Sequence, residues 1–178
     1  MSSLARLSDL LRARDSLDAA ISEIIGRPAL IGHLGEYIAS AIFDIELYKS
    51  ATHKGSDGTF RTGKLAGRSV NIKWYPKQQG LLDLNENTVP DSYLVLAGPK
   101  SQAASSRGDT RPFNICSVFL FDSKALMEKL QGAGVKIGIA TSLRKELWAS
   151  AEIYPRHANP VIDVSEEQRR NLELFCHQ

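Results

Sequence analysis

Glu36, Asp57 and Lys73 are the residues whose types and spacing could support chemistry. Hydrolysis of a phosphodiester needs positive charge beside the phosphate and an activated water, and a Mg²⁺ ion held by carboxylates supplies both. Mg²⁺ keeps several of its own waters, so one or two protein carboxylates are enough to hold it. A nearby lysine can then orient the water or neutralise the charge that develops. Such a site needs an acid on one strand, with an acid and a lysine two residues apart on the next strand.

Each of these residues also has a purely structural interpretation. Asp57 lies in the sequence Gly55-Ser56-Asp57-Gly58, and an aspartate in such a turn often bonds to its own backbone. Glu36 lies away from the centre of the apolar stripe of its predicted helix, as surface residues do. Lys73 could extend into solvent from its strand. The three residues gain weight together, because one fold could bring all of them to one place.

Hydrophobic periodicity predicts the elements that must position these residues. In chain order they are helices over 4–25 and 29–43, separated by Gly26-Arg27-Pro28, a strand over 44–50, a polar stretch over 53–58 that leads into 59–61, and a strand over 68–75. Asp57 and Asn71-Ile72-Lys73 therefore fall on adjacent limbs of a predicted hairpin. Because side chains alternate along a strand, Asn71 and Lys73 share the face opposite Ile72.

The remainder of the chain predicts further strands and helices. The strands cover 93–97, 115–121 and 135–140, and the helices cover 124–131 with a cap at Asp122-Ser123, a segment from Thr141 or Ser142 to about 151, and 165–175 with a capping box at Ser165 and Gln168. This order predicts an α/β sandwich with a mixed central sheet flanked by helices. We expect one domain over 1–178, made of an N-terminal helix (1–28), a core (29–151) and a C-terminal helical extension (152–178).

The distribution of charge is more informative than its sum. The net charge is only +2, but residues 49–77 contain seven basic residues and one acid, a local charge of +6. A surface that faces phosphate would have this composition, and so would a solvated hairpin. The candidates for nucleic-acid contacts are His53, Lys54, Arg61, Lys64, Arg68 and Lys77.

Several classes of protein find no support in the sequence. No stretch approaches the roughly 20 apolar residues of a membrane span, and the N-terminus has no signal-peptide pattern, so we expect a cytoplasmic protein that does not bind membranes. The two cysteines, Cys116 and Cys176, suggest neither a disulfide framework nor a paired-cysteine zinc site. The chain also lacks a glycine-rich phosphate loop, a dinucleotide fingerprint and a glycine-flanked nucleophilic serine.

The arrangement of these segments resembles the PD-(D/E)xK nuclease superfamily. That superfamily has a glutamate on a helix, an aspartate in a hairpin and a strand with an acid two residues before a lysine, here matched by Gly35-Glu36-Tyr37-Ile38-Ala39, Gly55-Ser56-Asp57-Gly58 and Val70-Asn71-Ile72-Lys73-Trp74. The similarity in element order covers about residues 30 to 140. It implies a restriction-endonuclease-like fold and a DNA endonuclease of the restriction or defence type that depends on Mg²⁺ or Mn²⁺. It also favours a homodimer, because cutting both strands of a duplex suits two-fold symmetry.

The resemblance implies a role for each matched residue. Asp57 would be the principal metal ligand and Lys73 the catalytic lysine. Glu36 would hold a water on the metal or a second ion, and the backbone carbonyl of Ile72 could also coordinate.

Asn71 departs from the pattern of the superfamily, which usually has a carboxylate at this position. An amide oxygen brings no charge to a divalent cation, so the affinity for metal should fall. Three outcomes stay open: a nuclease with a weakened site, a nuclease in which Glu36, Asp83 or Glu86 replaces the missing acid, or a non-catalytic domain or partner subunit that binds DNA without cutting it.

Overall fold

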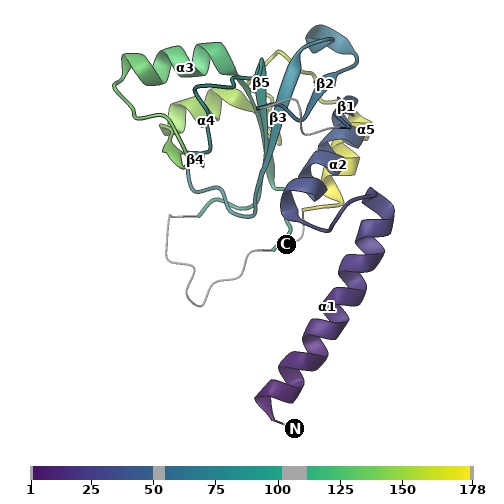
Figure 1. Ribbon diagram of the computed structural model, residues 1–178. Coiled ribbons are helices and arrows are strands. Elements are labelled where there is room, and N and C mark those ends of the chain that lie inside the picture. Colours follow the sequence, from purple (N-terminus) through teal and green to yellow (C-terminus); the bar gives the residue numbers. More distant parts are fainter. Residues whose placement is uncertain (1, 50–54, 102–111, 177–178) are drawn as a thin grey trace.

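The computed structural model describes residues 2–49, 55–101 and 112–176. Its centre is a six-stranded mixed sheet with helices on both faces, and helix α1 projects away from this body (Figure 1). The helices are α1 (Ser3–Ile25), α2 (Ile31–Phe43), the short 3₁₀ helix η1 (Gly63–Leu65), α3 (Ser123–Gly132), α4 (Lys145–Ala151) and α5 (Glu166–Glu173). The strands are β1 (Ile45–Leu47), β2 (Gly58–Phe60), β3 (Ser69–Tyr75), β4 (Leu81–Leu82), β5 (Ser92–Ala97), β6 (Ser117–Asp122), β7 (Thr141–Ser142) and β8 (Glu152–Tyr154).

The central sheet combines an antiparallel meander with one parallel pair. Its strand order is β1-β2-β3-β5-β6-β8, and β4 pairs with β7 in a separate small ribbon. Strands β1, β2 and β3 are antiparallel neighbours, β3 and β5 are parallel, and β5, β6 and β8 are again antiparallel. The prediction of an α/β fold with a mixed sheet flanked by helices is confirmed.

Alternating side chains of the central strands form a hydrophobic core on each face of the sheet. On one face, Ile72 and Leu94 pack with α2 and α5. On the other face, Val95 and Phe119 pack with α3 and α4, and the Trp148 ring meets Phe119 edge-on at a centroid distance of 4.8 Å. Every residue of β5 is buried, which explains why its sequence is a continuous apolar run.

The sequence-based prediction was wrong for the segment after α3. Residues 135–140 form no strand, because their backbone groups bond locally and to a neighbouring loop: the N–H of Gly138 donates to Thr141 Oγ1, and the N–H of Ala140 donates to Asp83 Oδ1. Helix α4 is capped at Arg144, without a side-chain hydrogen bond, and Thr141 and Ser142 belong to β7 instead. The short strands β4 and β8 were not predicted.

Other local predictions are confirmed. Asp122 caps α3 by accepting a hydrogen bond from the N–H of Ala125. Ser165 and Gln168 form the expected capping box at the start of α5. Within the described ranges of the chain, the helices are too short or too polar to cross a membrane.

Candidate active site

Asp57 lies at the edge of β3, directly before β2 begins. Its N–H donates to the carbonyl of Val70 at 2.8 Å, and its Oδ2 atom accepts a hydrogen bond from the N–H of Ile72 at 2.6 Å. The Asp57 carboxylate thus accepts a hydrogen bond from β3 that a backbone carbonyl of β2 would otherwise accept. Asn71 lies between the two residues that Asp57 contacts, so this aspartate is held by the predicted motif strand itself.

The glycines on either side of Asp57 allow the chain to pass close to two other segments. Gly55 has a positive φ of 85°, and a Cβ atom there would lie 2.3 Å from the carbonyl oxygen of Thr88. A Cβ atom on Gly58 would lie 2.5 Å from the carbonyl oxygen of Glu46 in β1. Neither position has room for a side chain, so sterics as well as turn formation require glycine at both.

Glu36 approaches this region from helix α2. Next to it, Gly35 faces β3, and a Cβ atom there would lie only 3.0 Å from Cβ of Trp74. The absence of a side chain at Gly35 therefore lets α2 lie close against the sheet. The Glu36 carboxylate forms an ion pair with Arg27, in the turn between α1 and α2, and its side chain is only 17% exposed.

Three charged groups, Glu36, Lys73 and Arg27, act on the Asp57 carboxyl. Burial raises the pKa of the Asp57 carboxyl above its ordinary value, and the negative charge of Glu36 raises it further. The hydrogen bond from Ile72 and the positive charges of Lys73 and Arg27 act in the opposite direction. The structure therefore brings Glu36 and Lys73 each within electrostatic range of Asp57.

Glu36 and Lys73 belong to opposite faces of the sheet. Ile72 points into the core beneath α2, the helix that carries Glu36. Asn71 and Lys73 alternate with Ile72 along β3 and belong to the opposite face.

Asn71 contributes a buried amide whose oxygen has no hydrogen-bond partner in the described part of the chain. The residue is 9% exposed, and its Oδ1 atom accepts no hydrogen bond among the described residues. A buried acceptor in this condition costs about 1–3 kcal/mol relative to a satisfied one. The position that departs from the nuclease pattern is thus also a position where a donor or a cation would relieve a cost.

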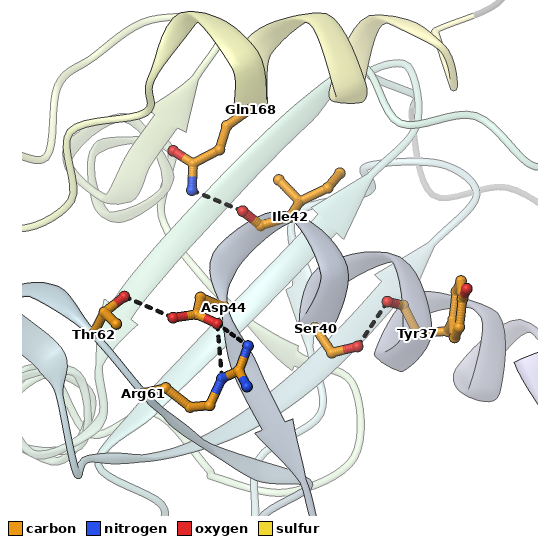
Figure 2. Close-up of polar contacts among 7 residues, drawn as sticks. All are labelled: Tyr37, Ser40, Ile42, Asp44, Arg61, Thr62 and Gln168. Atoms are coloured by element: carbon orange, nitrogen blue, oxygen red, sulfur yellow. Dashed lines mark hydrogen bonds and ion pairs between the residues drawn. The ribbon is translucent and has the colours of Figure 1, made fainter.

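The basic residues proposed for nucleic-acid contact are mostly engaged within the chain. Figure 2 shows Arg61 and Thr62 bound to Asp44, the residue that ends α2 in a left-handed conformation with φ 53°. The hydrogen bonds from Thr62 and Arg61 hold the pKa of Asp44 below its ordinary value. These contacts fasten the end of β2 to α2, and Gln168 of α5 fastens the same helix by donating to the carbonyl of Ile42.

The other basic residues proposed for nucleic-acid contact lie in different surroundings. Lys64 donates to the carbonyl of Pro160 at 3.2 Å, and Arg68 lies between Asp91 and Asp122 at 3.7 and 3.6 Å. Lys77 follows β3 and lines a small pocket with Tyr75 and Asp83. His53 and Lys54 lie outside the described residues.

The alternative acids of the sequence analysis have other surroundings. Asp83 accepts hydrogen bonds from the N–H of Ala140 at 2.7 Å and from the Tyr75 hydroxyl at 3.2 Å, and it is not among the described charges that shift the Asp57 pKa. Glu86 is exposed on a loop. Over 2–49, 55–101 and 112–176, no three His, Cys, Asp or Glu side chains gather into a metal-binding group.

Sequence reasoning missed Arg27. The motif Gly26-Arg27-Pro28 predicted only an interruption between helices, and Gly26 does end α1 in a left-handed conformation. Nothing in the local sequence indicates that the guanidinium reaches Glu36, because that contact depends on how α2 leaves the turn.

The chain matches no protein-family model, and a search of curated proteins finds no relative.

Proposed function

We propose that this chain is a divalent-metal-dependent DNA endonuclease of the restriction-endonuclease-like fold, with its active site around Asp57. The observation that supports the proposal is the half-buried Asp57 carboxylate, which accepts a hydrogen bond from the N–H of Ile72 on β3. The charges of Glu36 and Lys73 act electrostatically on this carboxylate. A buried carboxylate with a raised pKa, beside a second acid and a lysine, is typical of functional sites. The order helix, antiparallel meander, parallel strand agrees with the resemblance.

The donor atoms of the site fit a small hard cation. Asp57 and Glu36 provide carboxylate oxygens, Ile72 provides a backbone carbonyl, and Mg²⁺ prefers such oxygen ligands. The unsatisfied Oδ1 atom of Asn71 adds a neutral oxygen to the same strand. When bound by Asp57 and Glu36, Mg²⁺ or Mn²⁺ would supply positive charge beside the phosphate.

The residues of the chain have distinct parts in this mechanism. Asp57 would hold the cation, with its carboxylate oriented by the hydrogen bond that it accepts from the N–H of Ile72. Lys73 neutralises the negative charge that develops on the phosphate or orients the attacking water. Arg27 opposes cation binding while it is paired with Glu36, because it already neutralises that carboxylate. DNA contacts would come from Lys64, Arg68, Lys77 and the segment with His53 and Lys54, with Arg61 at the end of β2.

A second function is favoured by two specific observations. Asn71 stands where the superfamily has an acid, and Arg27 compensates Glu36 without any metal. Both features suit a non-catalytic DNA-binding module or a partner subunit of the same fold. Such a module would keep the phosphate-facing charges but would not hydrolyse DNA.

Cleavage of supercoiled plasmid with Mg²⁺ or Mn²⁺ tests the proposal. We expect nicked or linear product that EDTA suppresses, and we expect Asp57→Asn and Lys73→Met to abolish it. Glu128→Gln and Lys124→Met are matched controls, because both residues are exposed on α3, and these variants should cut like the unchanged chain.

DNA binding at several salt concentrations separates the two functions. Binding that weakens steeply with salt, without cleavage by any divalent ion, would establish the non-catalytic module instead. Full cleavage by both site variants, or cleavage that resists EDTA, would overturn the proposed active site. No retention of DNA even at low salt would overturn both functions.

A further inference from the structure

Helix α1 presents apolar side chains that the described residues leave largely uncovered, although Asp18, Ile21, Ser22 and Ile25 in its second half are half-buried. None of its 23 residues is buried, and the helix extends away from the sheet (Figure 1). Leu4, Leu7, Leu11 and Leu17 are 50–76% exposed. A solitary helix of this length, about 34 Å, is marginal in water, and exposed apolar patches mark interaction surfaces.

Seven residues of α1 follow the alternating three- and four-residue spacing of a helix-pairing seam, and Leu10, Leu17 and Ile24 lie beside it. We call this set the α1 seam: Leu4, Leu7, Leu11, Arg14, Asp18, Ile21 and Ile25. Its two ends are apolar, its centre has one base and one acid, and it spans three heptads, the length at which such a pattern becomes informative. In the structure Arg14 and Asp18 lie on the same side of the helix, with 3.4 Å between Arg14 Nε and Asp18 Oδ2.

The charges of the seam decide how two copies could pair. In a parallel pair, Arg14 would face Arg14 and Asp18 would face Asp18, so both central layers would repel. In an antiparallel pair, Arg14 of one copy faces Asp18 of the other, and this contact occurs twice by symmetry. The same register places Leu7 against Ile25 and Leu11 against Ile21, so these layers are complementary, and Leu4 lies beyond the end of the partner's α1.

The other charges of α1 have the same polarity. In the first half of the helix Arg6, Asp9 and Arg12 give a net charge of +1, and in the second half Asp15 and Glu23 give a net charge of −2. The first turn has no acid and the last turn has no base. This distribution of charge, basic before acidic along the helix, opposes the dipole of the helix itself. An antiparallel partner would set each basic half against an acidic half and would also oppose the two dipoles.

A groove at the base of α1 continues the apolar surface. It has a volume of about 410 Å³ and lies between the end of α1 and α2, with Ile21, Ile24, Leu34, Tyr37 and Trp74 among its lining residues. In the antiparallel register, Leu4 of the second copy lies about one turn beyond Ile25, where this groove begins. The start of the partner's helix is therefore the occupant that fits the groove.

We infer that two copies of this chain form a homodimer through antiparallel pairing of their α1 helices. The occupant of the α1 seam and of the groove is thus a second copy of the chain. This inference does not depend on nuclease activity.

Sedimentation equilibrium of charge-reversed variants tests the pairing. The unchanged chain should be a dimer, and Arg14→Asp or Asp18→Arg alone should raise the dissociation constant at least about 100-fold, because each places like charges in both central layers. The double variant Arg14→Asp/Asp18→Arg should restore the dimer. Because α1 contacts little of its own chain, the single variants should keep the thermal unfolding of the globular body.

Two further variants provide a matched control and a test of orientation. Leu11→Glu should dissociate the dimer, whereas Ala13→Glu, off the α1 seam, should not. Under mild oxidation, Leu7→Cys protein should cross-link to Ile25→Cys protein in a mixture beyond the background of the unchanged chain. Cross-linking of Leu7→Cys protein with itself would show a parallel pair, and a monomer at every concentration would show that the helix does not pair; either result overturns the inference.

Discussion

Replacing Asp57 by alanine should destabilise the fold, whereas asparagine should leave it nearly as stable at pH 7. The Asp57 carboxylate accepts a hydrogen bond from the N–H of Ile72 at 2.6 Å in a half-buried position. Alanine leaves this N–H without an acceptor, which costs about 1–3 kcal/mol. Asparagine keeps an acceptor oxygen and removes a charge that burial and Glu36 disfavour.

Urea unfolding measures the difference directly. With an m-value of about 2 kcal/mol/M, the loss in Asp57→Ala corresponds to a midpoint lower by about 0.5–1.5 M, and the melting temperature should fall by several degrees. Both variants should lose metal-dependent cleavage equally. The reasoning is refuted if the two variants are equally unstable, or if Asp57→Ala unfolds at the midpoint of the unchanged chain.

The difference in stability between Asp57→Asn and the unchanged chain should depend on pH in a defined direction. Because the pKa of Asp57 is raised in the folded state, the unchanged chain binds this proton more tightly when folded than when unfolded. The stabilisation is fully present below the unfolded pKa, near 3.8, and is lost as the pH rises through the folded pKa. The stability of Asp57→Asn relative to the unchanged chain should therefore increase from acid toward neutral pH. A decrease over this range would show that the folded state favours the carboxylate.

The remaining predictions concern the approach of α2 to the sheet and the counter-charge of Glu36. Gly35→Ala should be less stable than Gly32→Ala by about 1–3 kcal/mol in urea, because a Cβ atom at Gly35 meets Trp74 at 3.0 Å and one at Gly32 meets nothing within 4 Å; equal stabilities would contradict the close packing. Arg27→Gln should tighten Mn²⁺ binding by up to about fivefold in calorimetry, because it removes a half-exposed positive charge that pairs with Glu36. Unchanged or weaker binding would show that Arg27 does not compete with the cation.

Elements whose identity depends on local periodicity could be predicted from the sequence. The helical spacing over 4–25 and the buried apolar run of β5 both have the predicted structure. The capping box of Ser165 and Gln168 is likewise a local signal, because both of its hydrogen bonds form within one turn. Such signals involve contacts between near neighbours in the chain.

Elements that depend on distant partners could not be predicted. The segment 135–140 has apolar residues typical of a strand, but a carboxylate 57 residues away holds Ala140 in a turn. Strand β8 has three residues, too few for a periodic pattern, and it exists because β6 provides its hydrogen-bond partners. Propensity alone cannot decide such short segments.

The sequence by itself determined which residues could form a site and which strand carries each of them. It placed Asp57 beside β2 and Lys73 on β3, since alternation and turn signals are local properties of the chain. Only the tertiary structure decided that the Glu36 carboxylate acts electrostatically on Asp57, and that Arg27 pairs with Glu36. These contacts depend on the packing of α2 against β3, and electrostatic interactions depend on distance in space, which the spacing of residues along the chain does not specify.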